Sequence, residues 1–202
     1  MNHLAHFRVA WPDPGLIVGG FLGDFVKGQL KGDFPMQIER GIALHRAVDA
    51  YTDQHAMTRR SVLRFAPDFR RVGPIMVDVI YDHLLARQWE SLAAGAHESG
   101  SATSLARFSD MVFDTIDACD TGLPPAACDA ATRMRSARSL ENYRDEAFIR
   151  RSFGYLGSRL KRDNPLPEGF GEFKQNEQGL IDDFHAFYPD LLAFSRRWQM
   201  NH

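Results

Sequence analysis

The chain has 202 residues, of which 44% are hydrophobic and 25% are charged, and its formal net charge is −2. These values predict one globular domain, residues 1–202, and exclude a collagen-like, low-complexity or wholly disordered chain. They indicate no general affinity for nucleic acid. The chain lacks the ~18-residue apolar run of a membrane span and the pattern of a secretory signal, and its two cysteines fit reduced thiols, so we expect a cytoplasmic protein without a membrane partner.

Helical periodicity extends along the chain, and strand signals are nearly absent. Pro14 after Asp13 has the pattern of a first helical turn behind its N-cap. Proline and glycine clusters separate the helical segments. We therefore predict an all-α fold, a compact multi-helix bundle. In chain order the predicted helices cover residues 2–10, 14–29, 35–57, 59–66, 71–94, 103–119, 125–138, 142–162 and 170–198.

The helix near 35–57 carries an apolar stripe that ends in polar residues. Ile38, Ile42, His45 and Asp49 share one face, because they are spaced four, three and four residues apart. Arg46 lies next to this face. A histidine and a carboxylate one turn apart at the end of an apolar stripe indicate a candidate site.

Two other helices repeat this interruption of an apolar face. In the helix near 71–94, Asp82 belongs to an apolar stripe and His83 is its neighbour, and Asp24 follows Phe21 and Leu22 in GGFLGDFVKG. A carboxylate on an apolar helix is costly to bury unless it is paired or binds a cation. Each of these residues is also explained by pairing inside the bundle or by exposure to solvent.

Carboxylates and imidazoles on three helices form a ligand set that suits Mn²⁺ or Mg²⁺ better than thiolate-bound zinc. At the N-terminus, NHLAH places His3 and His6 three residues apart on one face. That spacing fits metal binding or the capping of a short helix, and it does not distinguish them. The predicted ligand pool is Asp24, His45, Asp49, Asp82 and His83.

Positive charge is concentrated in two segments of an otherwise acidic chain. Residues 58–71 hold five arginines and one aspartate, and residues 133–162 hold nine basic and three acidic residues. Such asymmetry suits an anionic partner, and it also fits ordinary solvated helix faces.

Six segments together resemble the acyl carrier protein phosphodiesterases. The first four keep the order and spacing of the family, and with the last two the similarity covers nearly the whole chain, although residues 95–140 give little support. The segments are MNHLAH, LGDFVKG, GIALHRAVDAYTD, RRVGPIMVDVIYDHLLARQW, YRDEAFI and FHAFYPDLL.

The resemblance implies an all-α, HD-domain-like phosphohydrolase that uses Mn²⁺. Its implied reaction is hydrolysis of the phosphodiester between 4′-phosphopantetheine and the serine of holo acyl carrier protein, an acidic protein substrate. The HD pattern has an adjacent His-Asp pair, whereas this chain has the reverse order in Asp82-His83. The resemblance therefore supports the ligand pool without selecting its members.

The predicted roles follow from this reaction. Members of the ligand pool would hold the metal, and Arg46 or an arginine of Arg70-Arg71 would stabilise charge on the phosphate. His83 or a metal-bound water would protonate the leaving serine. The predicted catalytic residues are Asp24, His45, Arg46, Asp82 and His83. Two other functions stay open: hydrolysis of a small nucleotide such as guanosine tetraphosphate, and non-catalytic binding of an acidic partner. The residues predicted to bind the carrier protein are Arg70, Arg71, Arg138, Arg144 and Arg151.

Overall fold

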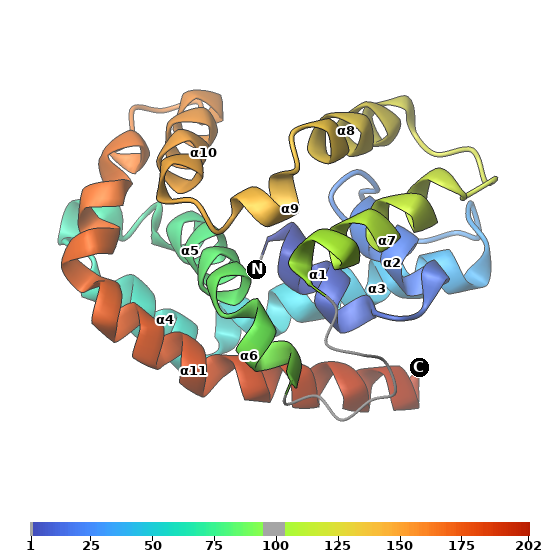
Figure 1. The fold of residues 1–202 in the computed structure, drawn as a ribbon, viewed down its shortest axis with the longest axis horizontal. Coiled ribbons are helices and arrows are strands. Elements are labelled where there is room, and N and C mark those ends of the chain that lie inside the picture. The colour runs from blue at the N-terminus through green and yellow to red at the C-terminus, as the bar shows by residue number, and fades with distance from the viewer. Residues whose placement is uncertain (1, 95–103) are drawn as a thin grey trace.

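Helices make up all the regular secondary structure in residues 2–94 and 104–202, the parts of the chain that the computed structural model describes (Figure 1). The prediction of an all-α fold is confirmed. The α-helices are α1 (His3–Ala10), α2 (Pro14–Leu22), α3 (Met36–Gln54), α4 (Ala56–Arg64), α5 (Gly73–Arg87), α6 (Trp89–Ala94), α7 (Leu105–Asp117), α8 (Pro125–Ser136), α9 (Ser139–Asn142), α10 (Glu146–Arg159) and α11 (Gly169–Asn201); short 3₁₀ turns cover Pro67–Phe69 and Leu166–Glu168.

Helix α2 begins as predicted and ends earlier than predicted. The Asp13 side chain accepts a hydrogen bond from the Leu16 amide at 3.0 Å, and Pro14 occupies the first turn. The predicted helix over 14–29 stops at Leu22. A loop follows, in which Gly28 and Gly32 adopt positive φ angles of 80° and 83°, a conformation that an α-helix does not contain.

Two predicted helices are each divided by a local break. The predicted helix over 35–57 ends at Gln54, and His55 then caps α4 by accepting a hydrogen bond from the Met57 amide. The predicted helix over 71–94 is interrupted at Gln88, where α5 ends and α6 begins. Apolar periodicity continues across such a break, which is why periodicity alone misses it.

The predicted helix over 142–162 begins later, at Glu146, behind the N-cap Asp145. The four-residue helix α9 precedes it, and Arg138 in the left-handed conformation separates α9 from α8. Residues 95–103, where the predicted helix over 103–119 begins, lie outside the described parts; α7 itself starts at Leu105.

Helices α2 and α3 pack closely because glycines face each other between them. A Cβ atom on Gly19 would lie 2.1 Å from the Ile38 carbonyl oxygen and 2.6 Å from Gly41 Cα, so no larger residue fits there. The close contact brings the end of α2 next to the middle of α3.

The long helix α11 extends along one edge of the molecule and contacts α1, α3, α4, α5 and α10 (Figure 1). Its buried Asp183 fastens it to α4. The carboxylate accepts hydrogen bonds from Arg64 Nε at 2.7 Å, Arg60 Nε at 2.6 Å and Ser61 Oγ at 2.9 Å. A buried carboxylate with this many donors holds a fixed position.

Among the described residues, none of the helices combines the length and the apolar character that crossing a bilayer requires.

Candidate metal centre

Helix α3 supplies His45 and Asp49, one turn apart. The distance from His45 Nε2 to Asp49 Oδ2 is 3.2 Å. The other ring nitrogen, Nδ1, lies 2.8 Å from the Gly20 carbonyl oxygen at the end of α2. Because a carbonyl oxygen only accepts, Nδ1 carries the proton, and in the neutral ring Nε2 presents its lone pair toward Asp49.

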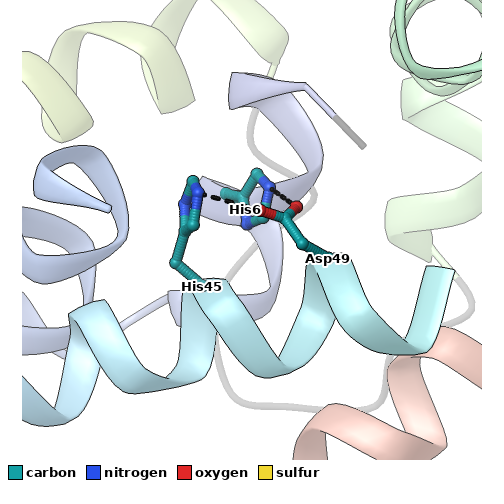
Figure 2. Close-up of side chains that lie close together, drawn as sticks. All are labelled: His6, His45 and Asp49. Carbon is teal, nitrogen blue, oxygen red and sulfur yellow. Dashed lines mark ion pairs between the residues drawn. The ribbon is translucent and has the colours of Figure 1, made fainter. Parts of the chain in front are cut away.

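Helix α1 adds His6, which faces the other oxygen of the same carboxylate. His6 Nε2 is 3.1 Å from Asp49 Oδ1, and the His6 and His45 rings stack with their centroids 3.9 Å apart. Figure 2 shows the two stacked imidazoles, which come from two different helices, beside the carboxylate of Asp49. One ligand atom from each of the three residues lies within 4.8 Å of the other two.

Asp24 and His3 lie at the edge of this cluster. Asp24, in the loop after α2, places Oδ1 3.9 Å from His45 Nε2 and Oδ2 3.6 Å from His3 Nδ1. These distances exceed those of hydrogen bonds. They leave Asp24 within reach of an ion held by the central three residues.

The cluster opens to solvent on its carboxylate side. The side chains of His6 and His45 are 4% and 5% exposed, whereas those of Asp49 and Asp24 are 45% and 50% exposed. A cavity of about 300 Å³ lies there, and a substrate group can reach the carboxylates through it. Its lining residues are Gly23, Asp24, Val26, Lys27, Gly28, His45, Arg46 and Asp49.

Gly23 makes room for the His45 ring. A Cβ atom at position 23 would lie 2.2 Å from His45 Cγ and 2.4 Å from its Cδ2, which is shorter than any real contact. The glycine at the end of α2 therefore sets the place of an imidazole on α3.

The electrostatics keep one imidazole neutral and the carboxylate charged. Burial lowers the pKa of His6 to about 4, although the hydrogen bond to Asp49 opposes this shift. Burial alone raises the pKa of Asp49, but the neighbouring imidazoles of His45 and His6 outweigh it and hold the pKa below its ordinary range. At neutral pH a neutral His6 thus faces a negative carboxylate.

This donor set fits a divalent metal ion. The Nε2 lone pair of His45 faces an Asp49 oxygen, and two such acceptors at 3.2 Å repel each other unless a proton or a cation lies between them. Neutral imidazoles with carboxylates are the ligands of Mn²⁺, iron and zinc in proteins. The carbonyl oxygen that holds His45 Nδ1 is the outer contact that metal-binding histidines commonly make.

Asp82 and His83, two members of the predicted ligand pool, lie outside this cluster. Both are fully buried in α5. Asp82 accepts hydrogen bonds from the backbone amides of Leu4, at 2.7 Å, and Ala5, at 3.4 Å. The predicted pool thus divides: the structure brings together Asp24, His45 and Asp49 and separates Asp82 and His83 from them.

His83 also has a contact of its own. Its Nδ1 lies 2.5 Å from the Tyr143 carbonyl oxygen, and burial lowers the pKa of His83. The neutral ring therefore donates from Nδ1 and ties α5 to the connection between α9 and α10. Burial also raises the pKa of the Tyr143 hydroxyl well above its ordinary value, and the carboxylates of Asp82, Asp78 and Asp24 add to that shift.

Arg46 lines the cavity, but its guanidinium is engaged by the backbone of the same loop. It donates to the Gly28 carbonyl at 2.7 Å and to the Val26 carbonyl at 2.9 Å. Arg46 thereby fixes the loop that carries Asp24. Lys27 also lines the cavity, and its exposed side chain forms no ion pair with the described residues.

Four of the five arginines predicted to bind a partner have partners within the chain. Arg70 donates to the Phe65 and Leu63 carbonyls, Arg71 to the Asp163 carbonyl, Arg138 to Glu141, and Arg144 to Glu90 and the Ala86 carbonyl. Arg151, on α10, is exposed and makes no such contact among the described residues.

Sequence reasoning left His6 and His3 undecided. Their signal, two histidines at i and i+3 in NHLAH, is too common to separate a metal ligand from a helix cap. The missing information is the packing of α1 against α3, which two segments about 40 residues apart do not reveal by pattern.

Comparison with known proteins defines the class of this all-α protein. The chain belongs to the acyl carrier protein phosphodiesterase family, whose model matches residues 1–191. It is thus a member of a family of phosphodiester hydrolases, as the resemblance of its motifs predicted.

Its relatives span the whole chain. A protein of Klebsiella pneumoniae named acyl carrier protein phosphodiesterase is 30% identical over 99% of this chain and 100% of its own. Proteins of the same name from Yersinia pestis and Escherichia coli are 31% and 29% identical, over 99% and 98% of this chain. No solved structure matches the chain. The predicted likeness to HD-domain phosphohydrolases stays a prediction.

Proposed function

We propose that this protein hydrolyses the phosphodiester between 4′-phosphopantetheine and the serine of holo acyl carrier protein, releasing apo carrier protein and 4′-phosphopantetheine. The observation that carries the proposal is the cluster of His6, His45 and Asp49, of which His45 and Asp49 line an open cavity. The family membership supplies the substrate class. Residues 1–202 act as one catalytic domain in this proposal.

We assign His6, His45 and Asp49 as the residues that hold a divalent cation, with Asp24 at its edge. Mn²⁺ is the ion we favour and Mg²⁺ the second, because the set mixes imidazole nitrogens with carboxylate oxygens. When bound, such a cation lowers the pKa of an attacking water and neutralises charge on phosphate oxygens.

The chain's own residues prepare the site for a phosphodiester. His45 presents Nε2 because the Gly20 carbonyl holds the proton on Nδ1. Lys27 places a positive charge at the cavity, where an anionic phosphate enters. Arg46 contributes by holding the loop of Asp24 through the Val26 and Gly28 carbonyls. We propose this role for Arg46 in place of stabilising charge on the phosphate.

Docking of the acidic carrier protein is the second part of the proposal. The exposed face of α10 carries Arg151, Tyr155 and Arg159, and Tyr155 is 60% exposed with Arg159 above its ring. Basic residues around an exposed aromatic side chain suit an acidic protein surface. Arg151 is the predicted partner residue that stays available for this contact.

The test is hydrolysis of holo carrier protein in the presence of Mn²⁺, followed by intact mass spectrometry. We expect a mass loss equal to the 4′-phosphopantetheine group, no loss after chelation, and no loss with His45→Ala. The matched control is His202→Ala, which also removes one histidine but lies at the exposed C-terminus. This variant should retain full activity.

Unchanged mass with every metal tested would contradict the proposal. Hydrolysis of guanosine tetraphosphate without action on holo carrier protein would favour the nucleotide phosphohydrolase instead. Binding of carrier protein without turnover would favour the non-catalytic function. The cytoplasmic location stays a prediction.

A further inference from the structure

Helix α1 supplies a ligand of the metal centre from its first two turns, and it is only eight residues long. A helix of this length has no stability of its own, so its place depends on contacts with the rest of the fold. His6 must nevertheless lie within hydrogen-bond distance of Asp49, on another helix. Something has to hold the beginning of α1 in place.

The amides of the first turn of α1 show what holds it. The His3 amide donates to the side chain of the N-cap residue Asn2 at 2.9 Å. The next two amides, of Leu4 and Ala5, donate to the two oxygens of Asp82. Asp82 belongs to α5, about 80 residues away in sequence, so a distant carboxylate completes the cap of the helix that carries His6.

The surroundings of Asp82 make this contact a rigid one. Its side chain is fully buried, and this burial raises the pKa of Asp82 to about 7, while the hydrogen bonds from the Leu4 and Ala5 amides oppose that shift. The neighbouring His83 fixes the same part of α5 to the Tyr143 carbonyl. The pair Asp82-His83 thus connects α1, α5 and the segment before α10.

We propose that Asp82 is a positioning residue of the metal centre: its carboxylate fixes the first turn of α1, and thereby His6, against the ligands on α3. We assign it no direct contact with the ion, because it lies outside the group of His6, His45 and Asp49 and its oxygens accept hydrogen bonds from backbone amides. This inference rests on the proposed metal centre.

The test compares two isosteric changes of buried carboxylates, Asp82→Asn and Asp183→Asn, in the full chain. Asp183 is equally buried, but its partners Arg60 and Arg64 lie on α4 and not on a ligand-bearing helix. Mn²⁺ affinity is measured by titration with electron paramagnetic resonance, and the number of water molecules on the bound ion by pulsed methods. Thermal unfolding reports the stability of each variant.

We expect Asp82→Asn to weaken Mn²⁺ binding by about 10- to 100-fold, the range for loss of an outer contact of a metal site, with the number of waters on the ion unchanged. Asp183→Asn should lower the melting temperature without changing Mn²⁺ affinity. Excess Mn²⁺ should restore the activity of Asp82→Asn. Asn2→Ala, which removes the other side-chain cap of α1, should weaken Mn²⁺ binding less.

An additional water on the ion in Asp82→Asn would identify Asp82 as a direct ligand and overturn the inference. Equal Mn²⁺ affinity of folded Asp82→Asn and wild type would also overturn it. His6→Ala tests the metal centre separately from the role of Asp82. If this variant binds Mn²⁺ as the wild type does, His6 is not a ligand, and the proposed metal centre and the proposed role of Asp82 are both wrong.

Discussion

At the scale of single residues, the candidate site depends on one carboxylate that two imidazoles share. Asp49 has a nitrogen of His6 on one oxygen and a nitrogen of His45 on the other, at 3.1 and 3.2 Å. The imidazoles are buried and the carboxylate is half exposed, so the ligand atoms are preformed while the open side faces the cavity. Preformed ligands reduce the ordering that a bound ion or substrate must impose.

Replacement of His6 tests the ligand that sequence reasoning left undecided. His6→Ala should reduce kcat/KM on holo carrier protein by more than about 100-fold, because losing a ligand exceeds the loss of an outer contact. Mn²⁺ titration of the same variant should show weaker binding. His202→Ala, at the exposed C-terminus, is the control; equal loss in both variants would argue against a role for His6 in the centre.

Replacement of Gly23 tests whether the His45 ring must keep its place. Gly23→Ala should weaken Mn²⁺ binding, since the added Cβ would lie 2.2 Å from the ring and force it to move. Gly20→Ala is the matched change in the same helix, because a Cβ there meets no atom closer than 4.0 Å. That variant should bind Mn²⁺ normally and gain up to about 1 kcal/mol of stability from helix propensity. Wild-type Mn²⁺ affinity in Gly23→Ala would contradict the expectation.

At the scale of elements, two buried carboxylates hold helices that are distant in sequence. Asp82 joins α5 to α1, and Asp183 joins α11 to α4. The first contact holds the helix that carries His6, whereas the second holds the long helix that extends along the molecule (Figure 1). Their loss should therefore have different consequences for metal binding.

The Asp183 contact predicts a pH dependence of stability. Burial alone raises the pKa of Asp183, but hydrogen bonds from Arg64, Arg60 and Ser61 lower it below its ordinary value near 3.8. The contribution of ionised Asp183 to the free energy of unfolding is thus present above about pH 4. It is lost as the pH falls through the lower pKa of the folded state. Asp183→Asn should cost about 2–3 kcal/mol at neutral pH, and its melting temperature should change less than that of the wild type below pH 4. Parallel melting curves for the two proteins would refute this.

At the scale of the whole molecule, the charge distribution predicts how a carrier protein approaches. The segment 133–162 carries a net charge of +6, yet Arg138 and Arg144 pair within the chain, whereas Arg151 on α10 pairs with none of the described residues. Exposed charges act over about 8 Å at physiological salt. We therefore expect kcat/KM on holo carrier protein to fall as ionic strength rises, while hydrolysis of a small phosphodiester changes less.

Charge reversal locates that surface. Arg151→Glu should raise KM for holo carrier protein more than it lowers kcat, because the residue would contact the partner and not the reacting phosphate. Arg196→Glu, an equally exposed arginine near the end of α11, is the control and should leave KM unchanged. A KM that is independent of salt and of the Arg151 change would remove α10 from the docking surface.

The sequence by itself determined the class of fold and the family, and it placed part of the site. Apolar residues at helical spacing, with proline and glycine between them, predict helices because the period of 3.6 residues is a local property. His45 and Asp49 were found for the same reason, since residues four apart share one face of one helix.

Only the tertiary structure decided which polar residues meet. His6 joins His45 and Asp49 through the packing of α1 on α3, whereas the equally suggestive Asp82 and His83 turn to backbone groups of α1 and of Tyr143. A buried polar residue needs a partner. The sequence shows that such a residue is present, but it does not show whether its partner is an ion, a side chain or a backbone amide of a helix. The partner is determined by contacts between segments that lie 40 to 80 residues apart in the sequence.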